Sequence, residues 1–336
     1  MTYSPKSVLI TGGAGFIGSN FIHHILSHDP SVQIVNLDKL TYAGSLANLE
    51  ALPDPRRHHF CHGDICDGRL VGSLLRSNRI DTVVHFAAES HVDRSIEHPA
   101  DFIQTNVVGT HTLLECCRQY WFEENKFDIS RCRFHHVSTD EVYGDLGPSD
   151  PRFTENSPYR PNSPYSASKA ASDHLVRAYG KTYGLAFTIS NCTNNYGPRQ
   201  HAEKFIPTIV RSCQQLKPIP VYGKGANIRD WMHVEDHSSA LHHVLTFGRP
   251  GSAYNIGVSN EWANLELVKL ICQIFDRLVP KHSPHERLIE FVKDRSGHDF
   301  RYAIDPSALA AIGWQIPRRD FESSLTALIV DALTIA

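Results

Sequence analysis

The sequence predicts an α/β fold in which helices cover both faces of a doubly wound parallel sheet, with a smaller mixed α/β lobe toward the C-terminus. Three observations lead to this prediction. Short apolar runs alternate with helical patterns through the first half of the chain, a glycine-rich turn joins the first run to the first helix, and polar side chains follow the ends of several runs. Alternating strands and helices favour parallel strand pairing.

Composition excludes several classes of protein. The 336 residues suffice for one large or two modest domains with a full core. A formal net charge of −3 indicates no nucleic-acid or anionic-membrane partner. No apolar run reaches the roughly 20 residues that span a bilayer, and no signal-peptide core precedes the first strand. Scattered cysteines and adjacent histidine pairs such as His135-His136 are poor chelates, so we expect a cytoplasmic protein with free thiols and no metal.

The first strand and helix carry a nucleotide-binding pattern. The apolar run Ser7 to Thr11 leads into GGAGFIG (residues 12–18) and then into an amphipathic helix. This order of strand, glycine turn and helix is what a Rossmann-type dinucleotide site requires. Gly12 and Gly15 would let a pyrophosphate approach the helix N-terminus. Glycine-rich turns are common, so the pattern needs support from the strands that follow.

The next three strand-like segments supply that support. Gln33 to Leu37 ends at Asp38, whose carboxylate would accept hydrogen bonds from an adenosine ribose and repel a 2′-phosphate, which favours NAD over NADP. A segment near Phe60 leads to Asp64-Ile65, in position to meet the adenine. Asp81 to Ala88 ends in small residues past which a cofactor can run. Together these segments predict a nucleotide-binding sheet.

Two long helices and a change of pattern define the rest of the chain. Helices are expected from Pro99 to Tyr120 and from Pro164 through Lys181; they either cover the sheet or pair with their copies in a homodimer, which we expect. After Asn191, prolines and glycines break the alternation, and a helix over Val234 to Thr246 should return to the sheet. We therefore expect a nucleotide domain of residues 1–190 plus about 228–250, and a substrate lobe of about 191–227 plus 251–336.

Acid–base residues gather after the apolar-leaning run that ends at Val137. Thr139, Asp140 and Glu141 follow it, at the strand end where ligands bind in open α/β sheets. Two carboxylates in different surroundings can divide the roles of acid and base, so Glu141 could remove a proton beside a ketone while Asp140 protonates a leaving hydroxyl. The alternative is an exposed acidic pair in a loop.

Tyr165 and Lys169 are four residues apart in the second long helix and so share one face. The ammonium of Lys169 and a nicotinamide ring would favour the phenolate, so we expect the pKa of Tyr165 to fall from its ordinary value of about 10. Tyr165 would then remove a hydroxyl proton while hydride leaves the same carbon. Thr139 would share that proton, and Lys169 would hold the nicotinamide ribose. The alternative is a surface Tyr and Lys on an ordinary amphipathic helix.

Through these motifs and several further segments, the sequence resembles the nucleotide-sugar 4,6-dehydratases of the extended short-chain dehydrogenase/reductase family. The similarity runs nearly end to end, and its main segments are residues 36–44, 87–95, 138–144, 163–170, 194–198, 229–231 and 294–304. The Thr-Asp-Glu triplet separates these dehydratases from related epimerases, which lack the acid pair. A catalytically silent binding protein would have lost the Tyr, Lys, Asp or Glu, and none is lost.

The resemblance implies an NAD-dependent lyase of deoxysugar biosynthesis whose substrate is dTDP-glucose. Tyr165 would assist oxidation of glucose C4, Glu141 and Asp140 would eliminate water across C5 and C6, and hydride would return to C6, giving dTDP-4-keto-6-deoxyglucose. UDP-glucose is an alternative substrate, and an NAD-dependent epimerase is a less favoured activity. Ser296 stands where a Pro is usual in this family, which leaves the base specificity open.

The resemblance also assigns residues to the two ligands. Those expected at the substrate are Ser90, Thr139, Asn194, Lys204, Arg229, Asn264, Arg295 and His298. Those expected at NAD are Gly12, Gly15, Phe16, Ile17, Asp38, Lys39, Thr41, Asp64, Ile65, Ala87, Ala88, Thr105, Tyr165, Lys169 and Asn195. A guanidinium suits a diphosphate because it offers a planar fork of donors, although Arg229 and Arg295 could instead form salt bridges between the lobes.

Overall fold

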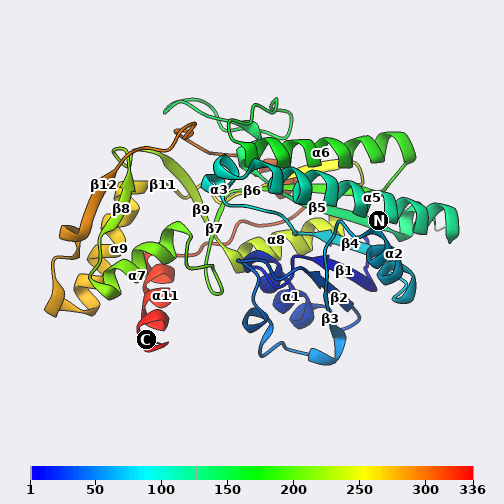
Figure 1. Cartoon of the computed structure of the whole chain (residues 1–336), viewed down its shortest axis with the longest axis horizontal. Helices are drawn as coiled ribbons and strands as arrows, with labels where there is room; N and C mark the ends of the chain where they lie inside the picture. The colour runs from blue at the N-terminus through cyan, green and yellow to red at the C-terminus, as the bar shows by residue number, and fades with distance from the viewer. Residues whose placement is uncertain (1, 126–127, 336) are drawn as a thin grey trace.

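A computed structural model describes residues 2–125 and 128–335 and shows a large lobe built on a seven-stranded parallel sheet (Figure 1). The strand order is β10-β6-β5-β4-β1-β2-β3. The chain adds strands outward from β1 on one side and then from β4 on the other, so the topological switch point lies between β1 and β4. The strands are β1 (Ser7–Thr11), β2 (Gln33–Asp38), β3 (His58–His62), β4 (Thr82–His85), β5 (Arg133–Thr139), β6 (Phe187–Cys192) and β10 (Ser252–Ile256). This is a Rossmann-type order, so the predicted fold class is confirmed.

Helices cover both faces of this sheet because its strands are apolar on both sides. Val8 and Ile10 of β1 point to one face, which is covered by α1 (Phe16–His28), α8 (Val234–Phe247) and α10 (Ser307–Ala311). Leu9 points to the other face, which is covered by α2 (Gly68–Ser77), α5 (Thr110–Arg118) and α6 (Pro164–Tyr183). Alternate residues of a strand face opposite sides, so a continuous apolar run is buried twice.

The two long helices form as expected and lie side by side (Figure 1). The first is a continuous helical run through α4 (Pro99–Phe102), a π-helical segment η3 (Ile103–Gly109), α5 and a second π-helical segment η4 (Gln119–Glu124). The second, α6, begins with a capping box between Ser163 and Ser166 and ends at Gly184, whose φ of 73° suits a glycine. A short helix α3 (Val92–Glu97) precedes the first run.

The smaller lobe has its own apolar core, on the left of Figure 1. It contains a three-stranded sheet of β7 (Asn194–Tyr196), β9 (Ile228–His233) and β11 (Glu261–Ala263), and a parallel pair of β8 (Ile219–Tyr222) and β12 (Ile289–Val292). Its helices are α7 (Phe205–Gln215), α9 (Asn264–Leu278) and α11 (Phe321–Ile335). The apolar C-terminal helix packs Leu325 and Ile329 into this core. Along residues 2–125 and 128–335, every helix is too short or too polar to cross a membrane.

The lobes exchange segments near residue 250. The sequence pattern placed everything after residue 250 in the smaller lobe, whereas β10 pairs with β6 at the edge of the large sheet. Leu309 and Trp314 then pack into the core between the large sheet and the helices α1 and α8. Helix α8 returns to the large sheet as expected, packing against α1. A five-residue strand such as β10 carries too little pattern to reveal which sheet it joins.

Candidate active site

A cavity of about 340 Å³ follows the carboxyl ends of the parallel strands and is closed on one side by Lys204, Phe205 and Trp231 of the smaller lobe. This volume lies within the roughly 300–1,000 Å³ of small-molecule sites. Every residue that the resemblance assigned to NAD lines it, from Gly12 to Asn195. The topological switch between β1 and β4 therefore opens into this cavity, as expected for this class of sheet.

The glycine turn fits a dinucleotide. Gly12 has a φ of 72°, and a Cβ on it would lie 2.6 Å from the backbone nitrogen of Ala87, so a side chain is excluded there. Helix α1 starts after Gly15, which has no side chain to cap the first amides. Gly15, Phe16 and Ile17 all line the cavity. The free amides and the helix dipole thus offer a diphosphate a place at the helix N-terminus.

Gly12→Ala is expected to destabilise the protein and weaken NAD binding. The left-handed backbone and the contact with Ala87 together should cost about 1–3 kcal/mol of unfolding free energy. Thermal unfolding and calorimetric NAD titration would measure the two effects. Gly15→Ala is the matched control for stability, because Gly15 has a φ of −78° and its Cβ would meet only the Gly12 carbonyl oxygen at 3.3 Å. A Gly12→Ala protein as stable as the Gly15→Ala protein would contradict this account of the turn.

The acidic residues expected at the adenosine also line the cavity. Asp38 is buried, with Oδ2 accepting from the amide of Ala14 and Oδ1 from the amide of Leu40, each at 2.8 Å. Each carboxylate oxygen can accept a further hydrogen bond, so two ribose hydroxyls remain suitable donors. Lys39 forms an ion pair of 2.7 Å with Asp64 at the rim. The residues present therefore fit a dinucleotide without a 2′-phosphate.

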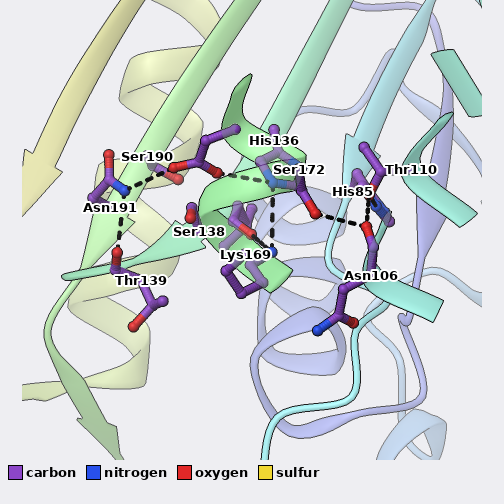
Figure 2. Close-up of polar contacts among 12 residues, drawn as sticks. His85, Asn106, Thr110, His136, Ser138, Thr139, Lys169, Ser172, Ser190 and Asn191 are labelled. Carbon is purple, nitrogen blue, oxygen red and sulfur yellow. Dashed lines mark hydrogen bonds and ion pairs between the residues drawn. The ribbon is translucent and has the colours of Figure 1, made fainter. Parts of the chain in front are cut away.

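Tyr165 and Lys169 are both buried on the same face of α6, so they are not an ordinary surface pair. Lys169 Nζ donates to the carbonyl oxygen of Val137 at 2.9 Å and lies 3.5 Å from His136 Nε2 (Figure 2). Burial lowers the pKa of Lys169 to about 8, with the charge of Asp173 opposing that effect. Phe102 packs edge-on against the Tyr165 ring.

The expected fall in the pKa of Tyr165 is wrong for the protein without its ligands. Burial raises the pKa of Tyr165 well above its ordinary value, and the nearby charge of Glu141 raises it further. A hydrogen bond with Thr139 opposes these two causes only in part. Desolvation of the phenolate is therefore the largest effect on the pKa of Tyr165, whereas the spacing on the helix had suggested that Lys169 would dominate.

The acid pair lies on the floor of the cavity rather than in an exposed loop. Asp140 is buried, its Oδ1 accepts from the Thr139 hydroxyl at 3.4 Å, and its Oδ2 has no hydrogen-bond partner among the described residues. Burial, and then the charge of Glu141, raise the pKa of Asp140 well above its ordinary value. Burial also raises the pKa of Glu141, while Arg229 opposes the rise. The hydroxyl of Thr139 caps the turn by accepting from the amide of Glu141 at 3.3 Å.

The residues assigned to the substrate fall into two groups. Ser90, Thr139, Asn194 and Lys204 line the cavity, with Lys204 Nζ donating to the carbonyl oxygen of Ser90 at 3.2 Å. Burial lowers the pKa of Lys204. These side chains bring a cation and three polar groups to the cavity that the acid pair also lines.

The second group lies outside the described lining of the cavity. Arg229 stacks over Tyr302 and donates to the carbonyl oxygens of residues 228, 299 and 300, and it has no salt-bridge partner among the described residues. Arg295 does bridge the lobes, through an ion pair of 2.8 Å with Asp93 of α3. His298 Nδ1 lies 2.7 Å from Asp294, and Asn264 begins α9.

Sequence reasoning missed several side chains of the cavity. Glu89 and Trp231 belong to segments that carried the family resemblance, but neither received a role. His201 lies across from Tyr42, with ring centroids 5.7 Å apart, and follows the segment that ends at Pro198. Cys192 lines the cavity and donates to the carbonyl oxygen of Ser138 at 3.4 Å. The position of Cys192 at the last residue of β6 was the available signal, since strand ends line this site.

Comparisons with known proteins agree with this geometry. The sequence model of the family described as GDP-mannose 4,6 dehydratase matches residues 9–327. The chain is 50% identical to a dTDP-glucose 4,6-dehydratase of Salmonella typhimurium, covering 95% of this chain and 90% of that protein. It is 51% identical to a dTDP-glucose 4,6-dehydratase of Neisseria gonorrhoeae, covering 96% and 94%.

A solved structure matches the fold over the same span. It is DesIV, a dTDP-glucose 4,6-dehydratase from Streptomyces venezuelae with NAD and TYD bound, with a TM-score of 0.87 and 43% identity over 96% of each chain. The resemblance expected from the sequence motifs is thereby confirmed. On the family model and on relatives that are about half identical along almost the whole length, the chain belongs to the nucleotide-sugar 4,6-dehydratase family.

Proposed function

We propose that this chain is an NAD-dependent dTDP-glucose 4,6-dehydratase, which converts dTDP-glucose to dTDP-4-keto-6-deoxyglucose and water. The observation that carries the proposal is the acid pair Asp140 and Glu141 on the floor of a nucleotide-binding cavity, beside Tyr165. Oxidation or epimerisation at C4 needs no acid for a leaving hydroxyl, whereas elimination of water needs both an acid and a base. Two relatives described as dTDP-glucose 4,6-dehydratases are about half identical to the chain.

The proposed cofactor site is the cavity between the glycine turn and Lys169. The amides after Gly15 would receive the diphosphate, Asp38 would accept from the adenosine ribose, and Lys169 would donate to the nicotinamide ribose. When bound, NAD supplies the redox chemistry that the side chains lack: it takes hydride from C4 and returns hydride to C6. Trp231 of the smaller lobe is buried and lines the same cavity, so this lobe would limit access of water to the reaction.

For the first step, Tyr165 receives the proton of the C4 hydroxyl. The free protein holds Tyr165 as a neutral phenol, because burial and Glu141 raise its pKa. The proton must therefore leave Tyr165 before it can act as a base, and the ammonium of Lys169 on the same helix face favours that change. Thr139 can pass a proton between the substrate hydroxyl and Tyr165, since it interacts with the phenol in the free protein.

For the elimination, the two carboxylates are suited to different roles. Asp140 favours its protonated form because burial and the adjacent Glu141 raise its pKa well above its ordinary value, and its Oδ2 is unpaired among the described residues. It can therefore donate a proton to the departing C6 hydroxyl. For Glu141, the charges of Arg229, Arg295 and Lys204 oppose the rise in pKa that burial causes. These charges favour its ionised form and therefore its use as the base at C5.

The smaller lobe would hold the dTDP portion. Lys204 is the cation within the cavity, and the charges of Arg229 and Arg295 reach the same region, as their effect on Glu141 indicates. A bound diphosphate would compete with Asp93 for Arg295, since both are anions that suit its planar fork. We propose that the lobe of about 191–227 plus 251–336 binds the nucleotide sugar, except that β10 and α10 belong with the cofactor lobe of 1–190 and about 228–250.

Incubation of the purified protein with dTDP-glucose and UDP-glucose separately, followed by mass spectrometry, tests this function. The expected result is loss of one water from dTDP-glucose in preference to UDP-glucose. Loss of water from UDP-glucose alone would keep the chemistry and overturn the base specificity. An isomer of unchanged mass would identify an epimerase, and no reaction with NAD supplied would overturn the proposed activity.

We also propose a homodimer through the helical run of residues 99–124 and α6. Ile103 and Val108 of the first helix are 51% and 38% exposed, and Tyr183 at the end of α6 is 50% exposed, so this face presents apolar side chains to solvent. Sedimentation at micromolar concentration should give twice the monomer mass, and Ile103→Glu should lower it. A wild-type protein that sediments only as a monomer would contradict the dimer.

The proposed location is the cytoplasm. Cys61, Cys66 and Cys116 are free thiols that are partly exposed. Partly exposed thiols persist in a reducing compartment and tend to pair in an oxidising one. Fractionation of cells that express the chain would test this location.

A further inference from the structure

A carboxylate that no step of the proposed reaction uses lies beneath the catalytic residues. Tyr165, Lys169 and Asp173 follow one another at intervals of four residues and so lie along one face of α6. Asp173 is fully buried, at 0% exposure. A buried carboxylate stays ionised only where charges and hydrogen bonds compensate for the loss of water. The contacts of Asp173 therefore indicate which positive charges and hydrogen-bond donors compensate its negative charge.

Asp173 joins three elements that surround α6. Its Oδ2 accepts from the Tyr159 hydroxyl at 2.8 Å and from Asn191 Nδ2 at 3.3 Å. Its Oδ1 lies 3.2 Å from His136 Nε2 of β5. Asn191 Nδ2 also donates to the carbonyl oxygen of Thr139 at 3.1 Å (Figure 2). Both hydrogen bonds thus reach Oδ2, whereas Oδ1 has no hydrogen-bond partner among the described residues and makes only the ion-pair contact with His136.

His136 stands between Asp173 and Lys169. Its Nε2 is 3.2 Å from the Asp173 carboxylate and 3.5 Å from Lys169 Nζ, and Figure 2 labels the side chains of His136 and Lys169. All three side chains are buried. A carboxylate can only accept, so the proton of the neutral imidazole belongs on Nε2, facing Asp173. Burial and the charge of Lys169 lower the pKa of His136 to about 4, so the ring is neutral at neutral pH. An ammonium and a carboxylate therefore face each other across an uncharged ring.

Arg177 of α6, which interacts with Tyr159 and Tyr143, is a further cation on the Asp173 side of this cluster. The remaining titratable groups around Lys169 and Asp173 are uncharged at neutral pH. They come from α6, β4, β6 and the segment between β5 and α6, and they are Tyr165, His85, Cys192, Tyr143 and Tyr159. Burial lowers the pKa of His85 and raises the pKa of Cys192 and of the three tyrosines. Burial alone would raise the pKa of Asp173 too, but His136 and Lys169 hold it below its ordinary value. Among these groups, Asp173 is the anion that balances Lys169.

We propose that Asp173 is a positioning residue for the dehydratase reaction: its carboxylate is the counter-ion that keeps Lys169 protonated beside Tyr165. The inference rests on the proposed function, because Lys169 acts there by holding the ribose and favouring the phenolate. Asp173 touches neither ligand site, since it does not line the cavity among the described residues. Its effect reaches the reaction through the charge of Lys169.

The pH dependence of Asp173→Asn tests this role. The negative charge of Asp173 raises the pKa of Lys169, so its removal lets Lys169 lose its proton at lower pH. The alkaline limb of the kcat/KM profile is expected to move to lower pH by about one unit or more. Asp173→Glu, which keeps the charge, should restore the position of that limb. A fall in kcat/KM by the same factor at every pH would show a structural role alone and overturn the proposal.

Tyr159→Phe is the matched control. It removes a hydrogen bond to the same carboxylate oxygen and leaves the charge of Asp173 in place. The alkaline limb should stay where it is in the wild type. If Tyr159→Phe moves the limb as far as Asp173→Asn does, hydrogen bonding rather than charge sets it, and the proposal fails.

A double-mutant cycle on thermal stability tests the pairing without any activity. Lys169→Met and Asp173→Asn should each destabilise the protein, and the double variant should lose less stability than the two losses added together. Should Asp173→Asn alone fail to fold, recovery of folded protein in the double variant supports the pair. Additive losses, or no recovery, would overturn it. If the cycle shows coupling but the wild-type protein releases no water from dTDP-glucose, the pairing of Asp173 with Lys169 stands and the proposed function alone is overturned.

Discussion

Tyr165→Phe is expected to abolish the oxidation of dTDP-glucose, lowering the rate by roughly 10²–10⁴-fold, the usual contribution of a positioned acid or base. The substitution removes the one oxygen that receives the C4 proton and leaves the buried ring in place against Phe102. With NAD bound, addition of substrate should produce no absorbance of reduced nicotinamide. Stopped-flow absorbance on a single turnover would measure this directly.

The pH dependence of the wild type gives a second reading of the same residue. Because burial raises the pKa of Tyr165, the phenol is protonated in the free protein, and the rate of oxidation should rise with pH through the neutral range. With the nicotinamide ring bound, which favours the phenolate, the rate should then fall as Lys169, with a pKa of about 8, loses its proton. Reduced nicotinamide formed at the wild-type rate in Tyr165→Phe would show that another group takes the C4 proton.

Glu141→Gln is expected to separate oxidation from elimination. The amide keeps the shape of the side chain but cannot take the C5 proton, so reduced nicotinamide should form on the enzyme while release of water slows by roughly 10²–10⁴-fold. Spectra of the enzyme would show the reduced cofactor accumulating. Mass spectrometry in D₂O would show little deuterium at C5 of recovered sugar.

Glu89→Gln is the matched control for that substitution. Glu89 also lines the cavity, and burial raises its pKa as it does for Glu141, but its neighbours are Arg94, Asp101 and Lys39 rather than the acid pair. It should leave the ratio of elimination to oxidation unchanged. Rapid C5 exchange in Glu141→Gln, or an equal stall in Glu89→Gln, would contradict the role of Glu141 as the C5 base.

The sheet and the cofactor end of the cavity could be predicted because local sequence decides them. A strand, a glycine turn and an acidic strand end lie within about thirty residues of each other, and parallel strands bring their ends to one edge. The first strand was predicted at Ser7–Thr11, where the structure has it. The fourth is shorter than predicted and stops at His85, because Phe86 to Ala88 turn into the cavity wall.

The features that could not be predicted depend on groups far apart in the sequence. The ion pair of Arg295 with Asp93 joins residues about two hundred positions apart. The raised pKa of Tyr165 depends on how deeply the helix is buried and on Glu141, and neither follows from a four-residue spacing. The π-helical segment that carries Thr105 also has no distinct sequence pattern. A π-helix places one more residue in each turn than an α-helix does, and it can be built from the same residue types.

The central claim is that one active site oxidises C4, eliminates water and restores hydrogen at C6. The most direct test uses dTDP-glucose labelled with deuterium at C4 and locates the label in the product by NMR. This account predicts a product that has lost one water and carries the deuterium at C6. Deuterium retained at C4 in a sugar of unchanged composition would contradict it and identify an epimerase.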